Sequence, residues 1–215
     1  IVEALKAQGE VVAMTGDGVN DALALKDADI GIAMGSGAPA TRAVAQLVLL
    51  DGRFATMPGV VSEGRRVIGN IERVANLFVT KTVYVMLLSI LVGVFLWPFP
   101  FLPRHLTIVS SLTIGIPGFF LAMAPNARRY QPGFVARVLR FAVPAGIIAS
   151  AATFGSYALA RADSLSLTES RTTATITLLI MGLWILVLLA RPFTPLRTIL
   201  VAGMVVLVVG AFTVP

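Results

Sequence analysis

The chain has 215 residues, of which 57% are hydrophobic and 13% are charged, and its mean hydropathy is +0.88. Soluble globular domains are about 45–50% apolar and about 25% charged, so this composition argues against a wholly soluble protein. The sequence contains no cysteine and a single histidine, His105. These counts exclude a disulfide framework, a cysteine-ligated zinc site and a multi-histidine metal cluster within these residues.

The charges are unevenly distributed along the chain. Residues 1–81 carry eight Lys and Arg against nine Asp and Glu, whereas residues 82–215 carry nine Arg, no Lys and two acidic residues. Arginines between apolar stretches are typical of membrane helices with positive loops, so we expect a membrane protein that does not bind nucleic acid. The sequence begins at Ile1 and ends within an apolar run, so we expect an internal piece of a longer chain.

Residues 11–50 alternate short apolar runs with helical patches. This rhythm predicts a small parallel α/β sheet built on crossovers, and at about 50 residues it is too small for a complete doubly wound domain. We expect Asn20 and Asp21 to cap the first helix of this region. The predicted strands are 11–16, 30–34 and 47–50, and the predicted helices are 20–28 and 41–46.

From Pro58 the pattern changes to that of a long helix. Residues 60–97 contain no proline, and their first half is amphipathic before the sequence becomes apolar on all sides. We therefore expect one helix that starts in the cytosol and continues into the bilayer. Its apolar face is predicted from Val61, Val67, Ile68, Ile71 and Val74.

Five apolar stretches approach the roughly 20 residues that cross a bilayer. The predicted spans are about 77–97, 106–124, 139–160, 173–190 and 198–214. The arginines between them predict a multi-pass protein of the cell membrane with a cytosolic amino-terminal portion. By the same rule, 125–138 and 191–197 should also be cytosolic, and 98–105 and 161–171 should lie outside.

The most informative stretch is TGDGVNDALALKDADIGIAMG (15–35). Gly16 and Gly18 allow a sharp turn after a buried strand, where Asp17 is well placed to hold Mg²⁺ through a carboxylate oxygen. Asn20 can donate to a phosphoryl oxygen, and the following helix start offers N–H groups to the same anion. These features indicate a phosphoryl-transfer pocket. The alternative is an ordinary turn followed by an ordinary helix cap.

This stretch resembles the hinge signature of P-type cation-transporting ATPases, in their haloacid-dehalogenase-like phosphorylation domain. EGRRVIGNIERVANLF (63–78) is similar to the family's stalk, and SLTIGIPGFFLAMAPN (111–126) resembles its sixth membrane helix and the following loop. Within the family, the resemblance is greatest to actinobacterial calcium-transporting pumps. It implies a multi-domain protein, with a partial Rossmann-like α/β phosphorylation domain followed by all-α transmembrane helices. The implied divisions are a phosphorylation-domain part at 1–57, a stalk helix at 58–76 and a transmembrane domain at 77–215.

The resemblance also implies roles for individual residues. Asp17 would be the Mg²⁺ ligand, Asn20 and Asp21 would orient the aspartyl phosphate and its attacking water, and Thr15, Gly16 and Gly18 would shape the loop. ATP would bind mainly to domains absent from this chain. The family's DKTGT nucleophile motif does not occur here, so we expect no ATP hydrolysis by this chain alone. The implied partners are membrane lipid, the transported cation, with calcium suggested, and the missing amino-terminal part of the same pump.

The ion pathway departs from the pattern of better-known calcium pumps. Thr113 is followed by Ile114 where such pumps often carry a carboxylate, and no Asp or Glu occurs between Lys81 and Asp163. The candidates are Lys81, Thr113 and a helix break at Pro117 that frees backbone carbonyls. Each candidate also has a structural alternative. Lys81 could extend its side chain to the cytosolic face of the membrane, the Thr113 hydroxyl could serve only helix packing, and Pro117 could only kink its helix. The polar groups of the first two spans are Thr80, Lys81, Thr82, Tyr84, Ser89, Ser110, Ser111 and Thr113.

Two other functions remain open at this point. One is a haloacid-dehalogenase-like phosphatase remnant fused to an unrelated membrane anchor. The other is a non-catalytic membrane scaffold that binds a partner pump, an idea prompted by the absent nucleophile. The continuous helical pattern from the α/β region into the first span argues against a mere anchor.

Overall fold

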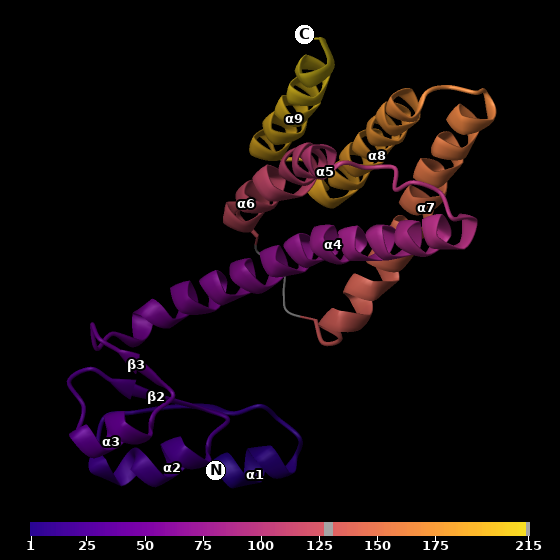
Figure 1. Ribbon diagram of the computed structural model, residues 1–215. Coiled ribbons are helices and arrows are strands. Elements are labelled where there is room, and N and C mark those ends of the chain that lie inside the picture. Colours follow the sequence, from indigo (N-terminus) through magenta and orange to yellow (C-terminus); the bar gives the residue numbers. More distant parts are fainter. Residues whose placement is uncertain (127–130, 214–215) are drawn as a thin grey trace. The chain divides into compact units, whose positions relative to one another are not determined.

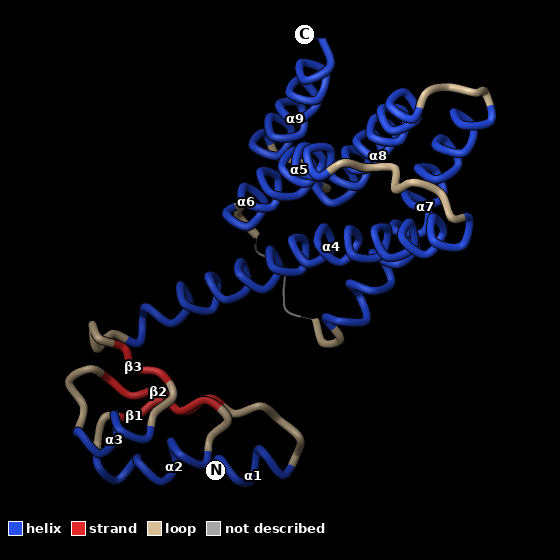
Figure 2. Tube along the Cα trace, viewed as in Figure 1, coloured by secondary structure: helices blue, strands red, loops and turns tan. Residues whose placement is uncertain are grey.

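The computed structural model describes residues 1–126 and 131–213. The chain divides into two compact units, the first ending at Ser62 and the second beginning at Glu63. The first unit contains a small parallel sheet with helices, and the second consists of helices (Figures 1 and 2). The observed architecture is therefore α/β followed by all-α.

The sheet of the first unit has three parallel strands in the order β1-β2-β3. Helices α2 and α3 contact each other and both contact β2, so they cover the same face of the sheet. Leu25 of α2 and Ile32 and Ala33 of β2 are buried. The elements are α1 (Val2–Ala7), β1 (Ala13–Gly16), α2 (Ala22–Asp27), β2 (Ile30–Met34), α3 (Pro39–Val44) and β3 (Leu47–Leu49).

The element types match the predictions, but some ends differ for local reasons. Strand β1 begins two residues late because the Val12 N–H donates to the Asp29 carboxylate, at 2.9 Å, instead of joining the sheet. Helix α3 begins at Pro39, a residue whose fixed φ suits the first helical position. Asp21 is the N-cap residue of α2, in agreement with the prediction, but among the described residues its side chain makes no capping hydrogen bond to α2, because it accepts from the Gly18 N–H of the preceding loop.

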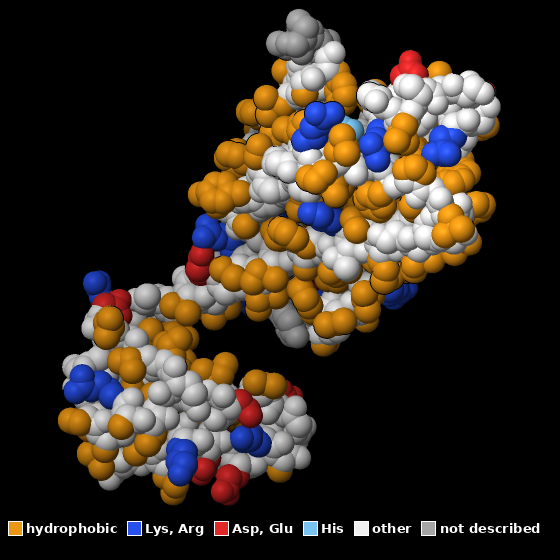
Figure 3. Space-filling model, viewed as in Figure 1, with side chains coloured by type: hydrophobic (Ala, Val, Ile, Leu, Met, Phe, Trp, Pro, Cys, Tyr) orange, Lys and Arg blue, Asp and Glu red, His pale blue; other side chains and the backbone are white. Residues whose placement is uncertain are grey.

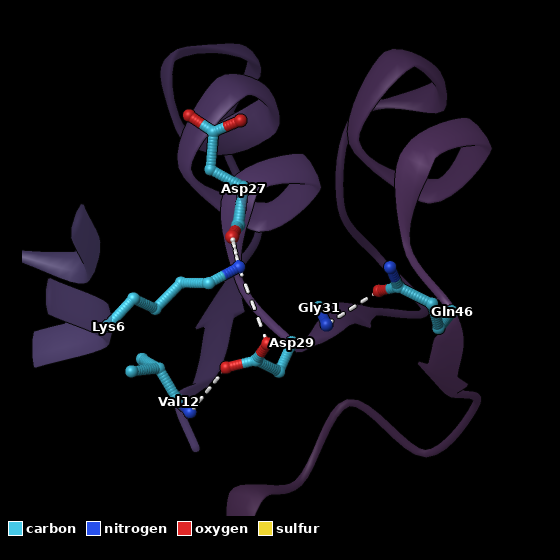
Figure 4. A network of polar contacts seen from close by, with 6 residues as sticks. All are labelled: Lys6, Val12, Asp27, Asp29, Gly31 and Gln46. Carbon is cyan, nitrogen blue, oxygen red and sulfur yellow. Dashed lines mark hydrogen bonds and ion pairs between the residues drawn. The ribbon is translucent and has the colours of Figure 1, made fainter. Parts of the chain in front are cut away.

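A network of polar contacts closes the end of the sheet where β1 and β2 begin (Figure 4). Lys6 of α1 donates to the Asp27 carbonyl oxygen at 2.8 Å and lies 3.3 Å from the Asp29 carboxylate. Gln46 accepts a hydrogen bond from the Gly31 N–H at 2.6 Å. These contacts lie at the opposite strand ends from the predicted phosphoryl-transfer loop, so their role is to hold α1 and the strand starts in place.

Among the described residues, five helical segments are long and apolar enough to cross a membrane. Each overlaps one of the predicted spans and begins at least three residues before it, and the first two end at Phe95 and Met123, slightly before the predicted ends. Residue 214, at the end of the last predicted span, lies outside the described residues, as do residues 127–130 of the predicted cytosolic loop. The helices are α4 (Met57–Phe95), α5 (Pro103–Ser110), α6 (Ile116–Met123), α7 (Phe134–Ala162), α8 (Leu167–Ala190) and α9 (Pro195–Thr213).

The apolar face predicted for the first half of α4 is not the face that is buried. Val61, Val67, Ile68 and Ile71 are all about half exposed, so they do not form its buried face. The stripe instead begins with polar side chains and becomes apolar further along. Its members recur at helical spacing: Asn70, Arg73, Asn76, Leu77, Thr80, Tyr84, Leu88 and Val92.

The helical unit has a packed core and an apolar outer surface. Tyr157 is fully buried, and its hydroxyl donates to the Pro98 carbonyl oxygen at 2.8 Å. Figure 3 shows hydrophobic side chains spread over the outside of these helices. Phe119, Ile148 and Trp184 are each more than half exposed. Apolar exposure on this scale is what helices that face lipid require.

Candidate functional site

The predicted phosphoryl-transfer residues lie together at the carboxyl end of β1. The strand ends at Gly16, Asp17 follows, and a 3-10 turn over Val19–Asp21 leads into α2. The Asp17 and Asn20 side chains are exposed, and neither makes a hydrogen bond within the described part of the chain. One short loop therefore presents a carboxylate and an amide at the carboxyl end of β1.

Asp21 shapes this loop through its carboxylate. Its Oδ2 accepts hydrogen bonds from the N–H groups of Asp17, at 3.3 Å, and Gly18, at 3.1 Å. A Cβ on Gly16 would stand 2.6 Å from the Asp21 Cβ, so only glycine fits there. Asp21 thus fixes the backbone around Asp17, a role that the sequence pattern did not indicate.

Neighbouring segments hold the loop from the other side. The Ala38 N–H donates to the Asp17 carbonyl oxygen at 2.8 Å, and the fully buried Thr41 hydroxyl donates to the Gly18 carbonyl oxygen at 2.7 Å. A Cβ on Gly37 would lie 2.9 Å from the Asp17 carbonyl oxygen. Thr41 is a residue that sequence reasoning missed, because nothing in its local pattern indicates a partner 23 residues earlier.

The residues present fit a divalent cation that is shared with a phosphate group. Within the described residues, no cluster of three or more His, Cys, Asp or Glu could enclose a metal ion by itself. Asp17 offers one unbonded carboxylate at an exposed loop, which leaves the other coordination positions to substrate oxygens and water. Mg²⁺ is commonly bound in this way, through one or two carboxylates together with phosphates.

The second set of candidate residues lies within the helical unit. Thr80, Tyr84 and Thr113 line a buried cavity of about 10 Å³, close to the smallest volume that holds one water molecule. Within the described part of the chain, the Thr80 hydroxyl is buried and has no hydrogen-bond partner, whereas the Thr113 hydroxyl donates to the Val109 carbonyl oxygen at 2.7 Å. This cavity is lined by hydroxyl oxygens and apolar groups, without a carboxylate among its lining residues.

The helix around Thr113 is not interrupted at Pro117. Residues 103–123 are helical throughout, with a wide π-helical turn over Ser111–Gly115 between α5 and α6. Such turns place side chains and carbonyls out of the ordinary α-helical register and are frequent at functional sites. Gly182 of α8 packs directly on this turn, since a Cβ there would lie 2.7 Å from the Thr113 Cγ2.

Lys81 and Pro117 do not line the small cavity. The Lys81 ammonium donates to the Ser110 hydroxyl at 2.9 Å, so its side chain connects α4 to the neighbouring span. Pro117 is buried in the first turn of α6. The structure thus gathers Thr113 with Thr80 and Tyr84, while the other two predicted residues lie outside this group.

Asn70 joins α4 to the end of α6. Its amide nitrogen donates to the carbonyl oxygens of Ala122, at 2.9 Å, and Ala124, at 2.6 Å, and the side chain is 1% exposed. The last carbonyls of a helix lack partners within the helix, and here a side chain from another helix supplies them. Asn70 lies within the segment predicted as the stalk, but the sequence did not indicate this role for it.

Comparison with known proteins gives relatives over the whole chain. It is 53% identical to Calcium-transporting ATPase CtpE of Mycolicibacterium smegmatis and 55% identical to the protein of that name in Mycobacterium tuberculosis. Each match covers 100% of this chain and 29% of the relative. A third relative, "Probable cation-transporting ATPase exp7" of Streptococcus pneumoniae, is 40% identical over 69% of this chain and 20% of its own length. No protein-family model matches.

Proposed function

Since the chain belongs to the P-type cation-transporting ATPases, as a carboxyl-terminal part of such a pump, we propose that it supplies part of the phosphorylation site and five membrane spans. The first unit would be the end of a haloacid-dehalogenase-type phosphorylation domain, with residues 58–76 as the stalk. The whole pump would couple ATP hydrolysis through an aspartyl phosphate to cation transport. The observation that carries this proposal is the exposed Asp17 carboxylate at the end of β1, on a loop that is held by hydrogen bonds to Asp21 and Ala38.

Asp17 would hold Mg²⁺ in this site. The ion, when bound, neutralises charge on the phosphoryl group. The Asn20 amide would donate to a phosphoryl oxygen and orient the group for attack by water. Asp21, whose carboxylate is already bonded to two backbone N–H groups, would keep Asp17 in position together with Thr15, Gly16 and Gly18. The phosphorylated aspartate and most of the ATP site would come from other parts of the pump.

The cation path would pass through the second unit. Thr80, Tyr84 and Thr113 supply oxygens to one small buried cavity, as a partly dehydrated cation requires. Calcium is the proposed ion, because relatives that match the whole chain are named calcium-transporting ATPases. A divalent ion held by neutral oxygens alone would be poorly compensated, so we expect a carboxylate from a span outside this chain or one cation per cycle. Lys81 would act as a fixed counter-charge.

The membrane orientation follows from the arginine distribution. Residues 1–73, 125–138 and 191–197 would face the cytosol, and residues 98–105 and 161–171 would face outside. A phosphatase with an unrelated anchor and a non-catalytic scaffold are less well supported. Relatives named as pumps match both units together, which an unrelated anchor would not produce.

The direct test is the Asp17→Asn variant of the full-length pump. The variant removes the anionic ligand while keeping the size of the side chain, so ATP turnover should fall by at least about a hundredfold at unchanged expression. Asp27→Asn is the matched control, because Asp27 is exposed and its carboxylate points away from Lys6, whose ammonium donates to the Asp27 carbonyl oxygen (Figure 4). Retention of most activity by Asp17→Asn would contradict the assignment.

A further inference from the structure

One wall of the cavity shared by Thr80 and Thr113 is formed by α8. The lining residues from this helix are Leu178, Gly182 and Ile185, and the first and last of these carry large buried side chains. Glycine is unfavourable within a helix because it loses the most conformational freedom on folding, so a glycine in the middle of α8 calls for a packing reason. Gly182 is therefore the point of this wall where α8 comes close to another part of the fold.

The residue that Gly182 approaches is Thr113 of the π-helical turn. A Cβ at position 182 would lie 2.7 Å from Thr113 Cγ2, 2.9 Å from its Cβ and 3.1 Å from its Oγ1. The threonine side chain is held in place, because it is 3% exposed and its hydroxyl is bonded to the Val109 carbonyl oxygen. A β-branched side chain in a helix also has few other rotamers. Any side chain at position 182 must therefore displace Thr113 or the turn that carries it.

The hydroxyl of Thr80 indicates that the cavity holds a ligand. Thr80 belongs to the cavity lining and is 2% exposed, and its hydroxyl has no hydrogen-bond partner within the described part of the chain. An unpaired buried hydroxyl is costly, so an occupant that bonds to it would be favoured. With a volume of about 10 Å³, the cavity has room for one water molecule or one bare cation.

Cations that bind oxygen differ in the space that they need. Mg²⁺ binds oxygens at about 2.0–2.1 Å and Ca²⁺ at about 2.3–2.6 Å, and the size of the cavity is one of the features that select between them. Among larger and smaller divalent cations, Sr²⁺ exceeds Ca²⁺ in radius and Mn²⁺ is smaller. A displacement of the Thr113 hydroxyl by a few tenths of an ångström would therefore change which ion fits best.

We propose that Gly182 is a positioning residue that sets the size of the cation bound between Thr80 and Thr113. The inference rests on the proposed ion site at this cavity and adds α8 to the helices that shape it. Because Gly182 has no side chain, Thr113 lies close against α8, and the cavity is left wide enough for an ion of the size of Ca²⁺. A side chain at position 182 pushes Thr113 away from α8, occupies part of the wall and favours smaller ions.

The test measures the concentrations of Sr²⁺, Ca²⁺ and Mn²⁺ that half-saturate ATP turnover in the full-length pump with Gly182→Ala. The apparent affinity for Ca²⁺ should fall by about tenfold, that for Sr²⁺ further and that for Mn²⁺ least, since one methyl group in a pocket changes discrimination by about this much. A merely structural role would weaken all three ions equally. Gly155→Ala is the matched control, because Gly155 lies within α7 and a Cβ there would meet no neighbour within 4 Å among the described residues.

Thr113→Ser supplies a rescue and a second, milder variant. It removes Cγ2, the atom nearest to the added Cβ, and keeps the hydroxyl. The double variant Gly182→Ala/Thr113→Ser should regain most of the affinity for Ca²⁺, and Thr113→Ser alone should shift the preference toward Sr²⁺. ATP turnover at saturating Ca²⁺ shows that each variant is folded.

The outcomes separate this inference from the ion site on which it rests. Unchanged ratios among the three ions in both Gly182→Ala and Thr113→Ser would overturn the role of Gly182, as would a shift toward Sr²⁺ in Gly182→Ala. The ion site itself fails if Thr80→Val and Thr113→Val both titrate like the wild type. Weaker ion binding in those two valine variants, with unchanged ion ratios in Gly182→Ala and Thr113→Ser, would leave the ion site standing and contradict only the proposal for Gly182.

Discussion

The side-chain amide of Asn70 donates to the Ala124 carbonyl oxygen at 2.6 Å, across 54 residues of sequence. It also reaches Ala122, so this single buried side chain satisfies carbonyls at the end of α6 from the middle of α4. Helix α6 follows directly on the turn that carries Thr113. The helix proposed as the stalk is therefore bonded to the helix that continues from the proposed ion site.

Replacing Asn70 by Ala should weaken this connection. The carbonyl oxygens of Ala122 and Ala124 would lose their donor in a buried place, which costs about 1–3 kcal/mol. We expect a lower thermal midpoint for the full-length pump and poorer coupling of ATP turnover to transport. Gln131→Ala, an exposed amide, is the control. An unchanged midpoint and unchanged coupling would show that the bond contributes neither stability nor communication.

Thr113→Val should weaken the apparent affinity for the transported ion. The substitution keeps the shape of the side chain while removing the hydroxyl from the cavity shared with Thr80 and Tyr84. Ion titrations of ATP turnover provide the measurement, with Thr82→Val as the control because Thr82 is exposed on α4. The cavity is not the ion site if Thr113→Val and Thr80→Val both titrate like the wild type.

Lys81→Met should change the ion dependence or the transport coupling. The variant removes a positive charge whose nitrogen donates to the Ser110 hydroxyl at 2.9 Å. Ser110→Ala removes only the hydrogen-bond acceptor and keeps the charge, so comparison of the two variants separates electrostatics from packing. Wild-type ion titrations and stoichiometry in Lys81→Met would contradict the counter-charge role.

The Asp29 carboxylate makes the start of β1 sensitive to acid. The hydrogen bond from the Val12 N–H, and then Lys6, hold the pKa of Asp29 below its ordinary value of 3.8. A carboxyl group with a lowered pKa stabilises the folded state above its ordinary pKa, and that contribution is lost as pH falls through the lowered value. Amide exchange of residues 11–16 should therefore be faster in Asp29→Ala than in the wild type at pH 6. The difference should shrink below pH 3.8, and a difference that persists unchanged would contradict the account.

The sequence predicted the element types well because hydrophobic periodicity is local. Strand β2 has the predicted bounds, and α4 runs as one helix through the predicted stalk into the first span. The sequence predicted an apolar face for the stalk but not which residues are buried, and Val61, Val67, Ile68 and Ile71 of that face are about half exposed. Asn70 and Arg73 are buried there instead, since Asn70 bonds to main-chain carbonyls that no local pattern reveals.

For the candidate sites, the sequence predicted the position of key side chains along the chain but not the tertiary contacts that hold them. The sequence motif around Asp17 predicted a carboxylate directly after a strand, and in the structure Asp17 follows the end of β1. The two groups that hold the loop, the Asp21 carboxylate and the Thr41 hydroxyl, depend on tertiary contacts that spacing alone does not specify. Likewise, the sequence could not predict that the Thr80 hydroxyl lies in the same cavity as Thr113 without a hydrogen-bond partner among the described residues, because this depends on the packing of α4 against the π-helical turn.

The central claim is that Asp17 serves a phosphorylation site completed by other parts of the pump. The most direct measurement is formation of the acid-stable phosphoenzyme from radiolabelled inorganic phosphate as a function of Mg²⁺ concentration, in full-length wild type, Asp17→Asn and Asp27→Asn. We predict Mg²⁺-dependent labelling in the wild type and in Asp27→Asn, and none in Asp17→Asn at any Mg²⁺ concentration that saturates the wild type. Labelling of Asp17→Asn with the same Mg²⁺ dependence as the wild type would contradict the claim.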